Sequence, residues 1–316
     1  MISSDLINQA EQGNLEALVQ LDANGMLLGR EESLPQYAER LRALQRNTAQ
    51  MEDELQRHGT FAVEGVTVQS EWRIPAALFA EAQAQTERLY AFRAEWVPGF
   101  FINPRYSLLF GGCSFYFHPD FFVLFIIRRV FATRSRWLIY NRQELLAHEM
   151  CHVARIALEA RRFEETFAYQ TATSPFRRLA GSICRSEAAA LWFLGSALGL
   201  LLAQLVQSLF WPALPVWPFW GLTVGVILTL ALQLLGLQRL YGRALRQAEW
   251  LAPGQAQRLL FRCTDEEVEA IAHLPSPEAA QSWLASRCQA QVRWQVIQAR
   301  FLAAQGVQRA PFEPVA

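Results

Sequence analysis

Lysine is absent from the 316-residue sequence, so all 29 of its Lys and Arg positions are arginines. We interpret this as a compositional bias; the alternative is a preference for lipid or phosphate groups, which the guanidinium group binds well. The arginines form no stripe interleaved with aromatic residues, so we expect no nucleic-acid partner. Charge is nevertheless uneven. Residues 1–100 hold 15 acidic side chains against eight arginines, and residues 101–186 hold 12 arginines against six acidic ones, while the whole chain is neutral.

Cysteine is scarce as well. The five cysteines are odd in number and scattered, with no C-x-x-C pair. This usage argues against a disulfide framework and indicates a reducing compartment. The N-terminus has neither a basic segment nor an apolar run behind it, so we expect no secretory signal peptide.

Long hydrophobic runs, by contrast, are present. The chain is 52% hydrophobic with a mean hydropathy of +0.07, and the runs 188–210 and 219–237 carry no charge. Each is long enough to cross about 30 Å of hydrocarbon as a helix, which predicts spans at about 188–210 and 219–240. Between them, residues 211–218 hold three prolines and two tryptophans, a composition typical of a tight turn at a membrane surface. The alternative is a helical hairpin buried in a soluble protein.

Arginines flank both predicted spans. Three precede the first span and three follow the second: Arg177, Arg178, Arg185, Arg239, Arg243 and Arg246. Because positive residues stay on the cytoplasmic side, both flanks are predicted to be cytoplasmic. We therefore expect an integral protein of the plasma (inner) membrane, with its catalytic domain and both termini in the cytoplasm.

Residues 148–152 spell H-E-x-x-H. On a helix, His148 and His152 lie on one face and can bind one Zn²⁺ ion per chain. Glu149 is then placed to act as general base on the zinc-bound water. Asn141 and Glu144 predict a capping box for this helix, and residues 137–140 a short strand leading into it.

This motif, with the strand and helix order before it, resembles the gluzincin group of zinc metallopeptidases, the thermolysin-like enzymes. The resemblance covers about a third of the chain. It implies a third zinc ligand on a following helix, which is Glu165 within Phe163–Tyr169, with Glu164 as the alternative. Tyr169 would replace an acidic residue that hydrogen-bonds to a ligating histidine.

Two further expectations concern residues around the motif. Cys151 is predicted to be a small buried apolar side chain. Arg155 lies on the metal-facing side of the helix, where it is expected to pair with Glu164 or with a substrate carboxylate; an ordinary surface arginine is the alternative.

The spacing of the ligands sets a geometric condition. Twelve residues separate His152 from Glu165, and none of them is glycine or proline. An unbroken helix would place the two about 20 Å apart, at ~1.5 Å per residue. A site that includes Glu165 therefore requires the chain to reverse between Ile156 and Phe163. Without it, Glu164 and Glu165 would be an acidic pair stabilising a helix N-terminus.

The remaining patterns predict an α+β chain in four parts: an N-terminal helical segment (1–60), a gluzincin-like catalytic domain (61–186), the transmembrane hairpin (187–240) and a cytoplasmic helical tail (241–316). The catalytic domain should combine a small mixed sheet with active-site helices. We expect strand structure at 61–74, a helix at 75–96, and strands near 107–117, 121–131 and 137–140. A turn at His118-Pro119-Asp120 should join two of these strands into a hairpin.

Together these patterns predict a membrane-anchored zinc endopeptidase that acts on peptide or protein substrates in the cytoplasm or near the lipid bilayer. The substrate is expected to pair with the sheet edge at 110–115, where two glycines permit close approach. The alternative is a membrane-tethered scaffold with a vestigial metal site. A protease acting within the bilayer is disfavoured, because the motif helix carries too many charges for a lipid-exposed span. The sequence indicates no oligomeric state.

Overall fold

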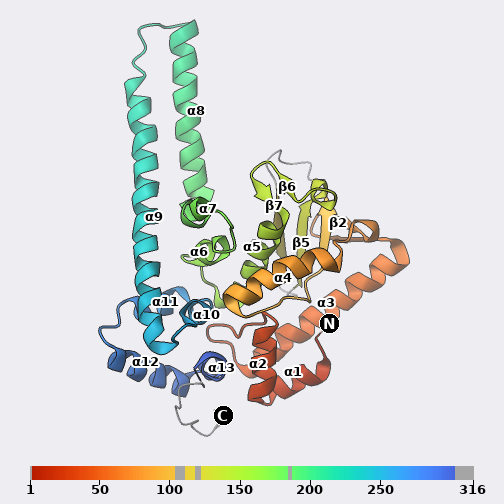
Figure 1. Cartoon of the computed structure of the whole chain (residues 1–316). Helices are drawn as coiled ribbons and strands as arrows, with labels where there is room; N and C mark the ends of the chain where they lie inside the picture. The colour runs from red at the N-terminus through yellow and green to blue at the C-terminus, as the bar shows by residue number, and fades with distance from the viewer. Residues whose placement is uncertain (1, 104–110, 118–121, 184–186, 303–316) are drawn as a thin grey trace.

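The computed structural model describes residues 2–103, 111–117, 122–183 and 187–302. It combines helices with small sheets, as predicted, and two long helices extend from one end of it as a hairpin (Figure 1). We call the part outside this hairpin the body; it comprises the described residues before α8 and those from Leu237 onward.

The N-terminal segment is helical, as its periodicity predicted. It consists of α1 (Ser4–Glu11), α2 (Leu15–Ala23) and α3 (Leu34–His58). Each helix starts at a polar side chain that accepts a backbone N–H, the arrangement that satisfies the free donors of a helix start. The helices separate at Gly13 and again over residues 24–33, so the chain breaks twice in this segment.

The next elements begin where predicted but end earlier. The strand structure is the hairpin of β1 (Thr60–Val63) and β2 (Val66–Gln69), followed by a 3₁₀ turn (Ser70–Trp72). The helix after it, α4 (Ala76–Tyr90), stops six residues before the predicted Trp96, because Ala91 adopts a left-handed conformation with φ 55°. Pro75 caps this helix with extended backbone and is not its first helical residue.

Three strands form the main sheet, in the order β3-β5-β4. They are β3 (Gly99–Ile102), β4 (Gly112–Phe117) and β5 (Phe122–Arg128). The predicted hairpin is confirmed, since β4 and β5 pair antiparallel with Phe115 opposite Leu124. Its predicted turn at 118–120 and the start of the predicted strand at 107–110 lie outside the described residues. The predicted strand 121–131 ends at Arg128, where a 3₁₀ turn (Arg129–Ala132) follows.

The central strand β5 is apolar without alternation because both of its faces are buried. Val123, Phe125 and Ile127 face the core that contains α4 and the motif helix. The intervening residues pack on the other side against α3 and the β1–β2 hairpin. The sheet is thus held between two layers and gives the motif helix a fixed support.

The strand predicted at 137–140 is a tight hairpin instead. Its arms are β6 (Arg136–Trp137) and β7 (Tyr140–Asn141), and Leu138 at the turn has φ 49°. The sequence predicted one continuous strand here because the turn residues, Leu138 and Ile139, include no Gly, Pro, Asn or Asp to mark a turn. The motif helix α5 (Arg142–Arg155) follows directly.

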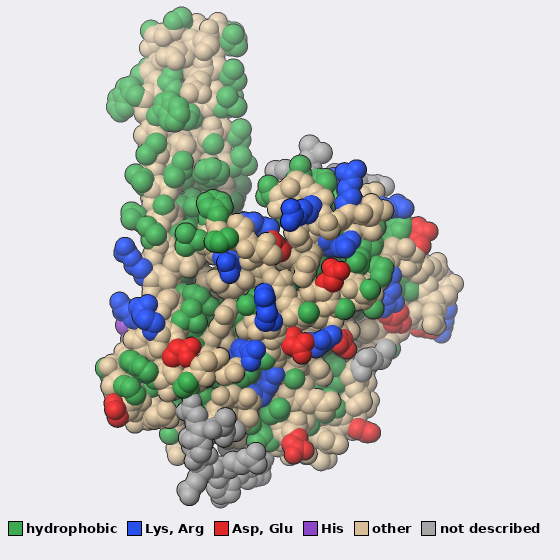
Figure 2. All heavy atoms as spheres, viewed as in Figure 1, with side chains coloured by type: hydrophobic (Ala, Val, Ile, Leu, Met, Phe, Trp, Pro, Cys, Tyr) green, Lys and Arg blue, Asp and Glu red, His purple; other side chains and the backbone are tan. Residues whose placement is uncertain are grey.

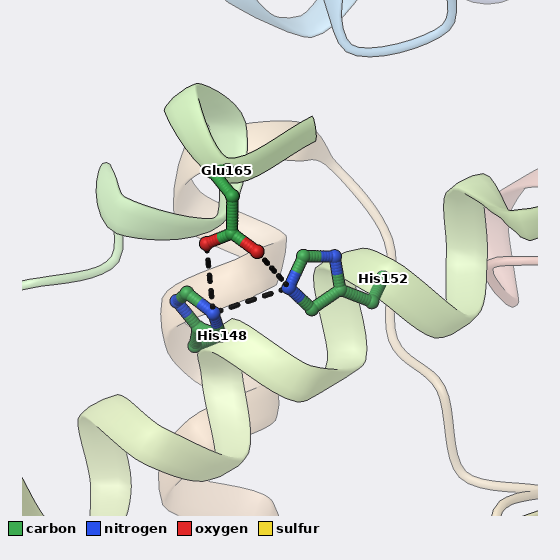
Figure 3. A group of neighbouring side chains, drawn as sticks. All are labelled: His148, His152 and Glu165. Carbon is green, nitrogen blue, oxygen red and sulfur yellow. Dashed lines mark hydrogen bonds and ion pairs between the residues drawn. The ribbon is translucent and has the colours of Figure 1, made fainter. Parts of the chain in front are cut away.

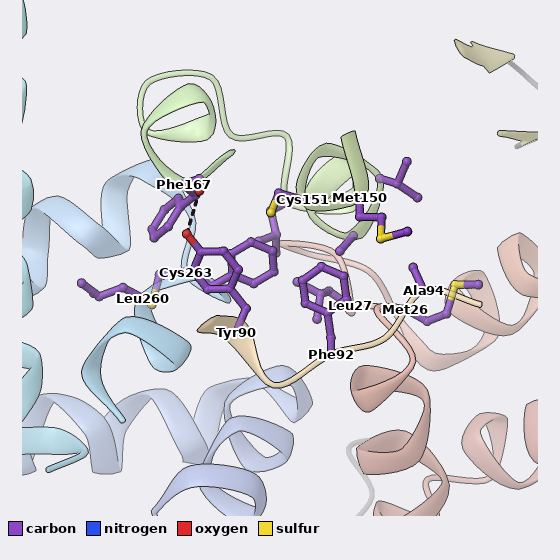
Figure 4. Close-up of a cluster of buried hydrophobic side chains, with 14 of the residues drawn as sticks. Met26, Leu27, Tyr90, Phe92, Ala94, Met150, Cys151, Phe167, Leu260 and Cys263 are labelled. Atoms are coloured by element: carbon purple, nitrogen blue, oxygen red, sulfur yellow. Dashed lines mark hydrogen bonds between the residues drawn. The ribbon is translucent and has the colours of Figure 1, made fainter. Parts of the chain in front are cut away.

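The helices after the hairpin pack against the same core as the N-terminal ones. They are the end of α9 (Trp217–Leu251), α10 (Ala256–Leu260), α11 (Asp265–Ala272), α12 (Pro277–Ala290) and α13 (Val292–Phe301). Figure 4 shows side chains from five distant segments in one cluster, among them Met26, Tyr90, Cys151, Phe167 and Leu260. The Tyr90 hydroxyl donates to the Phe167 carbonyl at 2.6 Å. Cys151 is fully buried, as predicted.

The helices α8 (Glu187–Leu209) and α9 are long and apolar enough to cross a membrane. In the most apolar stretch of each helix, only 17% of the residues are buried inside the structure. Most of their hydrophobic side chains therefore face outward (Figure 2). A core hairpin of a soluble protein would bury them. The second helix continues past the predicted end of its span at 240 and enters the body.

The packing of the N-terminal segment on Phe92 can be tested with two glycines. Gly25 (φ +77°) and Gly65 (φ +82°) both have left-handed backbone, but only at Gly25 would a Cβ atom lie 2.9 Å from the Phe92 ring. Gly65→Ala is expected to lower the free energy of unfolding by about 1 kcal/mol, the cost of the backbone conformation. Gly25→Ala should lower it by about 1–3 kcal/mol more, because the ring has to move. Equal losses in denaturant unfolding would contradict this packing.

Candidate metal centre

The helix α5 presents its two histidines side by side. The Asn141 side chain accepts the N–H groups of Gln143 and Glu144, which caps the helix as predicted. One turn apart on this helix, His148 and His152 bring their Nε2 atoms within 3.1 Å of each other. The two rings meet nearly at right angles, so both nitrogens point at one volume.

The predicted role of Glu144 in a capping box is wrong. Its buried carboxylate instead accepts the Thr173 N–H at 2.9 Å and the Thr173 hydroxyl, and it forms an ion pair with Arg177. Thr173 and Arg177 thus replace the Asn141 N–H, which would have been the partner of Glu144 in a capping box. This contact fastens α5 to α7 (Pro175–Ala180).

The chain reverses between the two ligand-bearing helices, as Glu165 requires. After α5 a 3₁₀ turn (Ile156–Leu158) leads to Glu159, which has φ 52°, and α6 (Glu164–Tyr169) then runs back over α5. The Glu165 carboxylate lies 3.6 Å from His148 Nε2 and 3.5 Å from His152 Nε2 (Figure 3).

These three side chains could hold a metal ion. Their donor atoms all lie within 4.8 Å of one another. Atoms bound at about 2.0–2.2 Å to one tetrahedral ion are a little over 3 Å apart. The two imidazole nitrogens, 3.1 Å apart, are close to this separation. Glu165 approaches each nitrogen with a different oxygen, Oε1 at 3.5 Å from His152 and Oε2 at 3.6 Å from His148. Two imidazole nitrogens and one carboxylate are also a donor set that zinc accepts, with one position left open.

The two histidines differ in electrostatic environment. Burial, together with the charges of His152 and Arg177, holds the pKa of His148 well below its usual value, against a hydrogen bond with the Ala168 backbone. Burial alone would also lower the pKa of His152, but the Glu164 carboxylate and the other acidic groups raise it to about 9. His148 is consequently neutral at pH 7, the form that binds metal.

Glu164, the alternative ligand, contacts the far side of His152. Its Oε1 lies 3.1 Å from His152 Nδ1, and its Oε2 accepts from Arg155 Nε at 2.7 Å. It orients the imidazole and leaves Nε2 free to bind a metal ion, an arrangement that commonly fixes the tautomer of a ligating histidine. The expected pairing of Arg155 with Glu164 is confirmed, and Arg155 is no surface residue, being only 1% exposed.

Glu149 points toward the sheet and the cleft. Its Oε2 accepts the Ser114 N–H at 2.9 Å and the Ser114 hydroxyl at 2.8 Å. Burial raises the pKa of this carboxyl, although His152 and the Ser114 bonds oppose the shift. Nothing in the sequence singled out Ser114, because its role arises from the packing of β4 against α5.

Tyr169 contacts His148 through its ring. The ring centroids are 4.7 Å apart, and the planes meet at 72°. Within the described part of the chain, its hydroxyl makes no hydrogen bond to either histidine, so the expected replacement for an acidic partner is not found there. Gly181 lies against this ring, leaving no room for a side chain.

A cleft of about 160 Å³ opens beside the three donors. His148, Glu149 and Tyr169 line it, together with Tyr140 and Arg177. The strand β4, predicted as the substrate edge, is an edge strand of the main sheet and reaches this cleft at Gly112.

Residues from beyond the hairpin support the reversal, and these were not foreseen. The Asp265 carboxylate accepts three consecutive backbone N–H groups, those of Arg161, Arg162 and Phe163, at 2.7 to 3.1 Å. The Arg155 guanidinium donates to the carbonyls of Phe261 and Cys263. The sequence indicated only that a helix begins near Asp265, because contacts across 100 residues leave no local pattern.

The site thus brings together two imidazoles and a carboxylate, next to a cleft lined by His148 and the buried carboxylate of Glu149. Such a set can bind a divalent cation and accept a proton beside it. No protein-family model matches the chain, and no curated protein or solved structure matches it either.

The role of Asp265 yields a prediction about metal affinity. Asp265→Ala removes the acceptor for three N–H groups next to α6, so Glu165 is held less firmly. We expect the affinity for Zn²⁺ to fall about 10- to 100-fold, as when other supports of a metal ligand are removed. Competition with a chromophoric chelator measures this affinity.

Glu266→Ala is the matched control for this experiment. Glu266 follows on the same helical turn, but its carboxylate pairs with Arg30 at 3.0 Å and does not touch the loop. Its affinity should equal that of the wild type. Equal losses in both variants would contradict a specific role for Asp265.

Proposed function

We propose that this chain is a zinc-dependent endopeptidase anchored in a membrane by α8 and α9. The observation that carries the proposal is the convergence of His148, His152 and Glu165 on one point, next to a cleft that His148 and the buried carboxylate of Glu149 line. A zinc ion bound there would supply Lewis acidity toward the scissile carbonyl and a water of lowered pKa.

Glu149 is the proposed general base. Its raised pKa makes it a stronger proton acceptor than an exposed glutamate. Ser114 holds Oε2 through two hydrogen bonds, so Oε1 is the oxygen left to take the proton from the attacking water. The same carboxyl group can then deliver this proton to the leaving amine nitrogen as the peptide bond breaks.

The proposed substrate is an extended peptide or protein segment along β4. This strand has β5 on one side only within the described sheet, so its other edge can accept an added strand. The glycine at its start is required by packing inside the protein, since a Cβ atom at Gly112 would collide with Ile127 of β5.

The proposed location is the plasma (inner) membrane, with the body and both termini in the cytoplasm. The body lies at one end of the hairpin, and only the Trp/Pro turn lies at the other (Figure 1). The arginines at 177, 178, 239, 243 and 246 all belong to the body end, as expected for the cytoplasmic side.

Glu149→Gln separates catalysis from metal binding. Because Glu149 is no ligand in this proposal, the variant should retain one zinc per chain and lose proteolysis about 10²- to 10⁴-fold. Zinc is measured by mass spectrometry and proteolysis with a denatured protein substrate. A wild-type protein that binds no stoichiometric metal would favour the scaffold function instead.

Glu165→Ala tests the third ligand. The variant should lose most of its zinc, because two imidazoles alone leave the ion without the carboxylate. Glu71→Ala is the control, since this exposed carboxylate lies in the 3₁₀ turn Ser70–Trp72 and does not belong to the group of donor residues. Retention of zinc by Glu165→Ala would point to Glu164 as ligand.

A further inference from the structure

The tip of the β6–β7 hairpin is apolar, exposed and strained. Leu138 and Ile139 are 64% and 75% exposed, and they form the whole two-residue turn. Such turns favour Asn-Gly because they require left-handed backbone, which Leu138 adopts at φ 49°. Neither turn preference nor burial accounts for two large apolar residues at this place.

A second exposed apolar pair lies just before the long hairpin. Phe176 and Leu179 of α7 are 74% and 50% exposed. Figure 1 places α7 and the β6–β7 hairpin at the end of the body from which α8 and α9 extend. Both exposed pairs are therefore near the level at which the apolar surface of α8 begins.

Arginines surround these apolar residues. Arg134, Arg136 and Arg178 are exposed, and none of them forms an ion pair with an acidic residue in the described ranges. Unpaired guanidinium groups next to exposed apolar tips match the two layers of a membrane surface, anionic headgroups above acyl chains.

We propose that the β6–β7 tip inserts into the membrane leaflet from which α8 and α9 emerge and forms a second membrane contact. A lipid surface is favoured over a protein partner because the hairpin of the same chain holds the tip beside one. This rests on the membrane part of the proposed function and is independent of zinc binding and hydrolysis.

The contact would determine where the cleft opens. Tyr140 follows the tip and lines the cleft, and Arg142 begins the helix with both histidines. A tip fixed in the headgroup region therefore holds the mouth of the cleft close to the bilayer. The substrates reached there are membrane-proximal segments of proteins anchored in the same membrane.

The test measures the depth of the tip in lipid. An environment-sensitive fluorescent amino acid is placed at position 139 of the full-length chain, in vesicles of phosphatidylcholine and phosphatidylglycerol with brominated acyl chains. The control carries it at position 289, an exposed residue of α12 at the opposite end of the body (Figure 1). We expect at least a twofold stronger quenching at 139; equal weak quenching would overturn the proposal, whether the tip is free or docked on a protein.

Two variants sharpen the result. Leu138→Asn suits the turn better than leucine, so the fold is kept while quenching at 139 falls. In the wild type, quenching at 139 should rise with the phosphatidylglycerol content of the vesicles, because the arginines bind anionic headgroups. Arg134→Gln combined with Arg136→Gln should abolish this rise. Unchanged quenching in both variants would contradict insertion of this tip. The zinc content of the same samples reports separately on the metal centre.

Discussion

Twelve residues separate His152 from Glu165, and the candidate metal centre depends on how this connection is bent. A left-handed Glu159 turns the chain, although no glycine is available to do so without steric cost. The Asp265 carboxylate holds the far side of the bend through three backbone N–H groups. Arg155 holds the near side through Glu164 and two carbonyl groups of the C-terminal helices. The third ligand is therefore positioned by contacts from a part of the chain that lies beyond the hairpin.

Charge balance in the centre follows from the same contacts. Arg155 compensates Glu164. Burial raises the pKa of Glu149, and burial together with the neighbouring carboxylates of Glu149 and Glu164 raises the pKa of Glu165. One buried and two partly buried carboxylates thus surround two imidazoles and one guanidinium group. A divalent cation at the three donors would offset the remaining negative charge, as expected for buried carboxylates that have few other partners. Both the charge of the centre and the arrangement of its donor atoms thus favour a bound cation.

The sequence revealed the parts of this arrangement that depend on local spacing. The histidine pair, the Asn141 cap and the two apolar helices are visible because their patterns span a few turns of helix. Glu165 was predicted from a resemblance, and the reversal it needs was predicted between Ile156 and Phe163, where it is found. Its exact position at Glu159 could not be predicted, because no glycine or proline marks it. The β6–β7 turn was missed because its residues are Leu and Ile. Asp265 and Ser114 could not be found, since each acts on an element distant in sequence. Glu144 was misassigned because its carboxylate accepts from Arg177 and Thr173 and not from the local donor, the Asn141 N–H.

The placement of Asp265 and Phe261 after α9 has a consequence for biosynthesis. A ribosome completes His148, His152 and Glu165 first, then both apolar helices, and only afterwards the residues that clamp the bend. During synthesis the chain emerges from its N-terminus. The segments that carry the histidines and Glu165 therefore cannot make their contacts with Phe261, Cys263 and Asp265 until those later residues have been synthesised. A nascent chain still lacking its last helices thus carries every ligand but not the framework that aligns them. Alignment of the candidate centre is thereby tied to synthesis of the helices that follow the hairpin.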